Sequence, residues 1–229
     1  MFDSLASRYD QAYESQRGKS LLAAEIDCLT PLLDDVGRPR LEVGVGTGRF
    51  AQALGIEHGV DPSGAMLEYA ERRGVNTIQA AGESLPYEDG TFAAALMVFT
   101  LCFVESPEEV LSEIKRVLRP GGALIVGIIP ANTAWSDTYV RQGKEGNPFY
   151  AEAHFYSVAE LRSLLKSAGF LIERARSALL LPPDGQPVER DSVEGIDDAA
   201  GLVALRCRKR SEAHSSLSQE VESCKTRKQ

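Results

Sequence analysis

Apolar and polar positions along this chain follow two different periods. Over residues 18–34 apolar side chains recur every three or four positions, which predicts an amphipathic helix, and residues 2–16 predict another helix before it. Further along, short apolar runs rich in β-forming residues predict seven strands, at residues 40–44, 57–61, 75–80, 92–99, 122–129, 170–179 and 201–208. The chain is therefore expected to begin with helices and to continue with strands separated by other segments.

The segments between most of these strands have helical patterns. One predicted helix begins at Ser63. Two others begin at Ser106 and Ser157, each followed three residues later by a glutamate, which is the pattern of a capping box. The proline and two glycines of "RPGG", residues 119–122, are predicted to end the helix that begins at Ser106.

Strands that alternate with helices predict an α/β fold of three layers. Right-handed crossovers then give a mostly parallel sheet with helices on both faces. Residues 181–201, between the last two predicted strands, are rich in Pro, Gly and Asp and have no helical pattern. Without a crossover helix, the last strand is free to run antiparallel to its neighbours.

Composition narrows the class of protein. With 229 residues, 43% of them hydrophobic, the chain can bury one substantial core, and we expect one domain over residues 1–210 followed by a disordered tail, residues 211–229. A net charge of -8 argues against binding to nucleic acid or to an anionic membrane. The longest apolar run, residues 93–104, is shorter than the roughly 20 residues that span a bilayer, and no signal-peptide pattern precedes it. We expect a cytoplasmic protein acting on a small molecule, with its oligomeric state left open.

The four cysteines are widely separated. They match neither a metal-ligand spacing nor a disulfide framework, so we expect reduced thiols and no metal site. Cys102 follows the fourth predicted strand, where it either packs among apolar neighbours or meets a substrate. The others are Cys28, Cys207 and Cys224.

A glycine-rich turn follows the first predicted strand. In "LEVGVGTGRF", residues 41–50, glycine occupies positions 44, 46 and 48. Glycines allow positive φ and let the backbone approach a ligand closely. A G-x-G-x-x-G dinucleotide fingerprint would need glycine at position 49, which is Arg49, so the NAD spacing fails. The plainer alternative is a tight strand-to-helix turn that binds nothing.

Asp61 ends the second predicted strand, 17 residues after Gly44. In a doubly wound sheet this position lies over the crevice beside the glycine turn, where a carboxylate can accept both hydroxyls of a ribose. The alternative role is to cap the helix after Pro62. Together the two signals favour a nucleoside-containing cofactor and leave NAD and other nucleosides open.

Four stretches, in order and spacing, resemble the motifs of class I S-adenosylmethionine-dependent methyltransferases, in particular the small-molecule branch of the ubiquinone and menaquinone biosynthesis type. They are "LEVGVGTGRF", "GVDPSGAMLEYA", "ESLPYEDGTF" and "RVLRPGGALIV". "FDSLASRYDQAY" resembles the family's helix over the cofactor, and "HFYSVAELRSLLKSAGF" its helix before the sixth strand. The resemblance covers roughly residues 1–208. It implies a Rossmann-like seven-stranded sheet with an antiparallel last strand, S-adenosylmethionine as cofactor, and methyl transfer to a small molecule.

The resemblance also implies roles for single residues. Glu42 would lie near the methionine end of the cofactor, Asp61 would hold the ribose, Met66 and Glu83 would border the adenine, and Phe99 would lie beside the reacting centre. The full set of implied cofactor-binding residues is Tyr9, Glu42, Gly44, Gly46, Gly48, Asp61, Met66, Gly82, Glu83, Val98 and Phe99.

This chain departs from the family pattern at two positions. Ala81 stands where an Asp usually binds the adenine amino group, and Ala93 replaces a frequent Asp early in the fourth strand. Glu83 or backbone groups are the alternatives for adenine. His154 precedes the helix that begins at Ser157 and is the candidate general base, with a surface or capping histidine as the plainer interpretation.

Two other functions stay open. One is a nicotinamide-dependent oxidoreductase, which Arg49 disfavours, and the other is a noncatalytic cofactor-binding or regulatory module. Methyl transfer from S-adenosylmethionine to a small-molecule acceptor is the expected activity.

Overall fold

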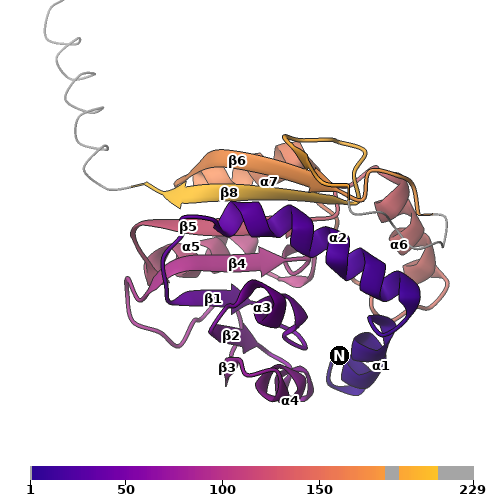
Figure 1. Cartoon of the computed structure of the whole chain (residues 1–229), viewed down its shortest axis with the longest axis horizontal. Coiled ribbons are helices and arrows are strands. Elements are labelled where there is room, and N and C mark those ends of the chain that lie inside the picture. Colours follow the sequence, from indigo (N-terminus) through magenta and orange to yellow (C-terminus); the bar gives the residue numbers. More distant parts are fainter. Residues whose placement is uncertain (1, 184–190, 211–229) are drawn as a thin grey trace, which may run out of the picture.

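The computed structural model describes residues 2–183 and 191–210. Figure 1 shows one twisted sheet with helices packed on both of its faces. The predicted tail, residues 211–229, lies outside the described residues, as does Cys224.

The sheet has the strand order β3-β2-β1-β4-β5-β8-β6-β7. The first five strands in this order, from β3 to β5, run parallel to one another, whereas β8 lies between β5 and β6 and is antiparallel to both. The strands are β1 (Arg40–Val43), β2 (His58–Asp61), β3 (Asn76–Gln79), β4 (Phe92–Val98), β5 (Leu118–Ile128), β6 (Phe170–Ala178), β7 (Val193–Glu194) and β8 (Leu202–Lys209). The α/β class and the antiparallel last strand are confirmed, and the predicted count of seven is one too low because β7 adds a short edge strand.

Alternating side chains of the strands bury two apolar cores. In β4, Ala95 and Met97 belong to the core under α5 and α7, whereas Leu96 and Val98 belong to the core under α2 and α3. The helices are α1 (Ala6–Ala12), α2 (Gln16–Leu33), α3 (Arg49–Leu54), α4 (Gly64–Arg72), α5 (Pro107–Val117), α6 (Ala134–Lys144) and α7 (Val158–Ser167), with short 3-10 helices η1 (Phe2–Leu5) and η2 (Leu101–Phe103). This is the three-layer arrangement predicted from the alternation of strands and helices.

Residues 2–16, predicted to be helical, form two short helices instead of one continuous helix. The chain forms η1 and then α1, turns after Ala12, and enters α2, whose cap is Ser15 accepting a hydrogen bond from the Gly18 backbone N–H. A Cβ on Gly18 would lie only 2.1 Å from the Ala12 carbonyl oxygen. Glycine at this position therefore lets the start of α2 pack against the end of α1.

One predicted capping box is present and one is absent. Ser157 and Glu160 exchange both hydrogen bonds at the start of α7, but the side chain of Ser106 makes no capping hydrogen bond at the start of α5, where Pro107 is the first helical residue. Helix α5 ends at Val117, and residues 119–122 lie in β5, which starts four residues earlier than predicted and is offset from β4 by a bulge. Helix α6 was not predicted because its sequence lacks a continuous apolar stripe.

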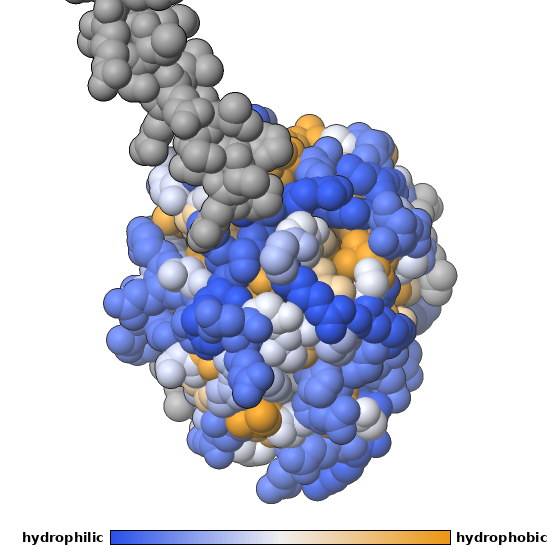
Figure 2. Space-filling model, turned by 90° about the vertical axis from the view of Figure 1, so that its left-hand side faces the viewer, coloured by the Kyte–Doolittle hydropathy of each residue, from blue (hydrophilic) through white to orange (hydrophobic). Residues whose placement is uncertain are grey.

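The parallel strands point toward the end of the molecule where α1 and α6 lie (Figure 1). Figure 2 shows the opposite end, where hydrophilic residues dominate the surface and apolar areas are small. In open α/β sheets ligands bind at the carboxyl ends of the strands, where the strand order reverses. Here that reversal lies between β1 and β4, the neighbours of the glycine turn.

Candidate active site

The three glycines of the turn after β1 have different structural roles. All three have positive φ, at +73°, +51° and +78° for Gly44, Gly46 and Gly48. A Cβ on Gly44 would lie 2.2 Å from the Thr100 side chain, and a Cβ on Gly48 would lie 2.8 Å from the Cα of Ala70. A Cβ on Gly46 would meet nothing within 4 Å. Gly44 and Gly48 therefore permit close packing, whereas Gly46 leaves open space over the backbone.

Asp61 joins the second strand to this turn. Its carboxylate oxygens accept hydrogen bonds of 2.9 Å from the backbone N–H groups of Gly46 and Ser63. Burial raises the pKa of the Asp61 carboxyl, and these two hydrogen bonds oppose that effect. The structure thus brings Asp61 and the glycine turn together, as the order of the strands predicted.

Glu42 is an acid buried in β1, with 1% of its surface exposed. Its Oε2 atom has no hydrogen-bond partner among the described residues. Burial, with the charge of Asp61 adding to it, raises the pKa of Glu42 well above its usual range. Buried polar atoms are normally hydrogen-bonded, so Glu42 Oε2 is an atom for which a ligand could supply the partner.

Other implied cofactor residues surround the same strand ends. Met66 is buried in the first turn of α4, and Val98 ends β4 before Phe99, which has a φ of +54°. Gly82 lies in the turn after β3, where an added Cβ would be 3.2 Å from side-chain atoms of Val43 at the end of β1. Glu83 follows in that turn and is partly buried.

The N-terminal segment is attached across α3 and α4. Asp3 accepts hydrogen bonds from the Ser63 hydroxyl, at 2.7 Å, and from the Ala65 backbone N–H. Asp10 pairs with Arg49 and with Arg73, each at 2.9 Å. Burial alone would raise the pKa of Asp10, but the hydrogen bonds from the two guanidinium groups lower it. Arg49, which breaks the NAD spacing, therefore anchors α1 over the site.

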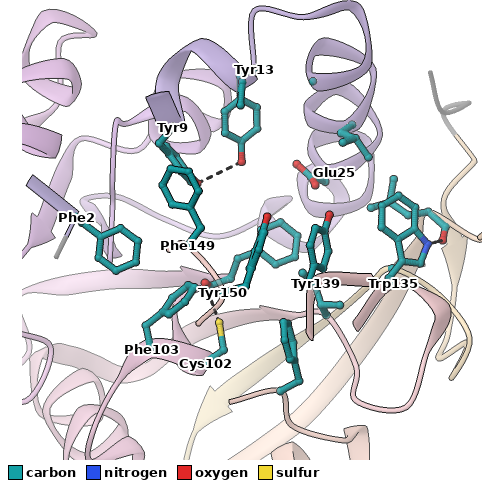
Figure 3. Close-up of a pocket in the computed structure, with 18 residues that line it drawn as sticks. Phe2, Tyr9, Tyr13, Glu25, Cys102, Phe103, Trp135, Tyr139, Phe149 and Tyr150 are labelled. Carbon is teal, nitrogen blue, oxygen red and sulfur yellow. Dashed lines mark hydrogen bonds between the residues drawn. The ribbon is translucent and has the colours of Figure 1, made fainter. Parts of the chain in front are cut away.

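Beneath this segment lies a cavity of about 210 Å³ (Figure 3). Ten of its 18 lining residues are aromatic, and they come from the N-terminal segment, the end of β4, α6 and the loop after α6. Tyr9 and Phe99 line it, so the cavity adjoins the residues expected at the cofactor. The aromatic residues are Phe2, Tyr9, Tyr13, Phe99, Phe103, Trp135, Tyr139, Phe149, Tyr150 and Phe155.

Among the described residues that line the cavity, Glu25 is the single carboxylate. It projects from α2, is 6% exposed, and its Oε2 atom has no hydrogen-bond partner among the described residues. Burial raises the pKa of Glu25 to about 8. This places a group that can exchange a proton near neutral pH inside an otherwise apolar and aromatic wall.

His154 does not line this cavity. Its side chain is exposed, its ring packs edge-on against Tyr156 with centroids 4.5 Å apart, and its backbone N–H donates to the Cys102 carbonyl oxygen. Cys102 does line the cavity, where burial raises the pKa of its thiol to about 12 and keeps it protonated. The role of His154 as a base therefore stays a prediction without support from its position.

The chain resembles known proteins over most of its length. A protein family described as a methyltransferase domain matches residues 41–126. An uncharacterized protein of Mycobacterium tuberculosis is 43% identical over 201 residues, which are 87% of this chain and 70% of that protein. A demethylmenaquinone methyltransferase of Clavibacter sepedonicus is 30% identical over 227 residues, covering 90% of this chain and 86% of that enzyme. A crystal structure from Thermotoga maritima is described as a SAM-dependent methyltransferase and possible histamine N-methyltransferase. Its sequence is 34% identical to this chain, and the two structures superpose with a TM-score of 0.82 over 91% of this chain and 98% of the Thermotoga chain.

This chain belongs to the S-adenosylmethionine-dependent methyltransferases. The resemblance to the class I, quinone-biosynthesis-like branch that its four motifs indicated is confirmed. Among its described residues, no helix of this methyltransferase has the length and apolar character needed to cross a membrane.

Of the residues that line this methyltransferase's cavity, the sequence alone pointed to Tyr9, Phe99 and Cys102, and it gave no role to Glu25. Glu25 had a recognisable signal, because it lies four residues after Leu21 and four before Leu29 on the predicted apolar stripe of α2. A charged residue on such a stripe must be paired or face a hollow. Tyr139 and Tyr150 had no signal, because α6 and the loop after it carry no motif.

Proposed function

We propose that this methyltransferase transfers a methyl group from S-adenosylmethionine to a small-molecule acceptor bound in the aromatic cavity. The observation that carries the proposal is the shared wall: Tyr9 and Phe99, both implied at the cofactor, line the cavity. A cofactor over Gly46 and an acceptor in the cavity would then meet at these two residues. Methyl transfer depends on such alignment of the two reacting groups.

The residues around the glycine turn fit this cofactor. Gly46 leaves room for a ligand to approach the backbone, the unpartnered Oε2 of Glu42 fits a polar group near the methionine end, and Asp61 offers carboxylate oxygens for the ribose hydroxyls. Burial raises the pKa of Glu42 well above its usual range, which favours the neutral carboxyl, and a neutral carboxyl can donate a hydrogen bond. When bound, S-adenosylmethionine supplies a methyl group attached to a positively charged sulfur, which is strongly electrophilic.

The side chains of the cavity exclude water and hold the acceptor. Aromatic faces attract positive charge, so the walls suit both the cofactor's sulfonium and a charged product. Tyr9 and Tyr13 hydrogen-bond to each other at 3.3 Å between their hydroxyl oxygens. Burial raises the pKa of Tyr9 to about 12, so its phenol is neutral and does not act as a base near pH 7.

Asp61 provides the test of the cofactor site. Hydrogen bonds to a charged group are worth about 1.5–3 kcal/mol each, so Asp61→Ala is expected to weaken binding of S-adenosylhomocysteine on the order of 100-fold. Asp61→Asn, which keeps the shape, should fall between the parent and Asp61→Ala, and Glu83→Ala should have a smaller effect. Calorimetry on protein shown to be folded by circular dichroism measures these affinities. Asp198→Ala, an exposed aspartate, is the matched control.

Each competing function predicts a different result. Tight NADH binding with no response to S-adenosylmethionine would indicate the oxidoreductase. Tight binding of S-adenosylmethionine with no transfer of labelled methyl to any member of a panel of amines, phenols and quinols would favour the noncatalytic module. If Asp61→Ala binds as tightly as the parent, the assignment of the ribose site is wrong.

A further inference from the structure

Glu25 is an unusual group to find in an aromatic cavity. Figure 3 shows its carboxyl extending from α2 toward the hydroxyl groups of Tyr13, Tyr139 and Tyr150. The rings of Tyr139 and Tyr150 lie 4.5 Å apart between centroids and form one wall. Burial is the one cause that shifts the pKa of Glu25, and no neighbouring positive charge opposes it. Among the described residues, the Oε2 atom of Glu25 therefore lacks the partner that a buried acid normally has.

The cavity therefore has the character of a cation site. A buried carboxylate without a compensating positive charge favours a cation and opposes an anion, because water does not screen the interaction there. The faces of aromatic rings favour a cation as well. Of the 18 residues in the lining, none is a lysine or an arginine.

Resting on the methyltransferase activity proposed above, we propose that the acceptor is a compact amine whose nitrogen binds to Glu25, and that Glu25 removes the proton that would block methylation. An ammonium group carries no lone pair, so an amine must lose a proton before its nitrogen can attack. A neutral alcohol of the same shape and an anionic carboxylate cannot form an ion pair with Glu25, and an anion would bind only while Glu25 stays protonated.

The volume of the cavity limits the size of this amine. An apolar cavity of about 150 Å³ holds a benzene molecule. The cavity here, at about 210 Å³, has room for a single ring and a short amine arm. Phenethylamine and histamine are therefore suitable probes.

The proton and electron balance of the reaction is simple. The ammonium displaces the proton of Glu25 to solvent as it binds, and an ion pair forms. The nitrogen then passes one proton to Glu25, its lone pair forms the N–C bond, and the S–C bond breaks with its electron pair remaining on sulfur. The product leaves as a methylated ammonium ion, and Glu25 is again protonated. One proton has been released to solvent in each turnover.

Glu25 is the group in this cavity that titrates near neutral pH. The tyrosines that face it, Tyr9 and Tyr139, have pKa values raised by burial to about 12, and those of Tyr13 and Tyr150 are raised as well. The thiols of Cys28 and Cys102 also have pKa values raised to about 12 by burial. Arg17 is a further charged residue at the start of α2, and its guanidinium lies 5.7 Å from the ring centroid of Trp135.

The test is a calorimetric titration of the parent protein saturated with S-adenosylhomocysteine. Three ligands that share a phenylethyl group are compared at pH 7: phenethylamine, 2-phenylethanol and 3-phenylpropionate. Histamine serves as a second amine. We expect an amine to bind at least 10-fold more tightly than either the alcohol or the acid, because only the amine can form an ion pair with Glu25. Repeating the amine titration in buffers of different ionisation enthalpy should show release of nearly one proton, since Glu25 is mostly protonated before binding.

Glu25→Gln is the decisive variant, because glutamine has almost the same shape and the Oε2 atom has no hydrogen bond to lose. It should weaken amine binding by about 10- to 100-fold, as expected for a charged hydrogen bond, and abolish proton release, with affinity for S-adenosylhomocysteine unchanged. Glu152→Gln, at an exposed position in the loop after α6, is the control and should change neither quantity.

The outcomes separate this proposal from the activity on which it rests. Failure of S-adenosylhomocysteine to bind would overturn the methyltransferase assignment itself. If S-adenosylhomocysteine binds but the alcohol binds as tightly as the amine, the amine proposal alone is overturned. The same holds if S-adenosylhomocysteine binds and neither amine does. Because the comparison of the three ligands is made on the parent protein, it decides the matter even if Glu25→Gln does not fold.

Discussion

Gly46 and Gly48 lie two residues apart in one turn, yet substitution by alanine should affect them in opposite ways. A left-handed backbone conformation lowers the stability of a folded protein by about 1–2 kcal/mol when the residue has a Cβ. Replacing glycine also reduces the freedom of the unfolded chain, which raises the stability by about 0.4–1 kcal/mol. Gly46→Ala should therefore lower the free energy of unfolding by about 1 kcal/mol or less, because its Cβ meets nothing within 4 Å.

Gly48→Ala adds a steric overlap to the same backbone cost. Its Cβ would lie 2.8 Å from both the Cα and the Cβ of Ala70, and overpacking of this kind costs typically about 1–3 kcal/mol. Together, the backbone cost and the steric overlap should lower the free energy of unfolding by about 2–4 kcal/mol. For a chain of this size about 1 kcal/mol corresponds to 2–4 °C, so Gly48→Ala should lower Tm by roughly 5–15 °C and Gly46→Ala by only a few degrees.

Binding should show the reverse order. An alanine methyl at position 46 would occupy the space through which the cofactor approaches, so Gly46→Ala should weaken S-adenosylhomocysteine binding at least 10-fold. Gly48→Ala, measured at a temperature where it stays folded, should bind within about threefold of the parent. Thermal melts and calorimetry on the two proteins give both quantities. If Gly46→Ala binds as well as the parent, the open space over Gly46 is not the cofactor site, and the reasoning from the turn fails.

Three other predictions concern Glu25, His154 and the C-terminal residues 211–229. The pKa of Glu25 in the folded protein, about 8, lies above its value in the unfolded chain. The contribution of Glu25 to stability is therefore fully present below the unfolded pKa and is lost as pH rises through about 8. Tm of the parent should fall more steeply from pH 5 to pH 9 than Tm of Glu25→Gln, and parallel curves would contradict this. If His154 is the base, His154→Asn should lower turnover about 100-fold with cofactor affinity unchanged. The exposed position of His154 instead predicts a change in turnover of less than threefold. Profiles of rate against pH for the parent and for His154→Asn decide between these two expectations. Removal of residues 211–229 should leave Tm and cofactor binding unchanged, because their sequence has no apolar period and β8 already ends at Lys209; a lower Tm would show that these residues contribute to the fold.

The sequence by itself determined the architecture and predicted where a cofactor would bind. Apolar runs and helical stripes locate the strands and most helices, because burial on one face imposes a period that can be read locally. The pairing of Asp61 with the glycine turn was also predictable, since the carboxyl ends of neighbouring parallel strands meet at one edge. The boundaries at α1 and β5 were less accurate, because a close approach between α1 and α2 and a bulge against β4 set them.

Only the tertiary structure decided the aromatic cavity. Its wall joins Tyr9 near the start of the chain, Glu25 in α2, and Tyr139 and Tyr150 more than a hundred residues later, and no local pattern records which of these meet. Periodicity shows that Glu25 lies on the buried side of α2, but it cannot show whether the surface opposite is packed or hollow. That depends on the long-range packing of α1, α6 and the loop after α6 over the ends of β4 and β5, and it is this packing that leaves a buried carboxylate without a partner.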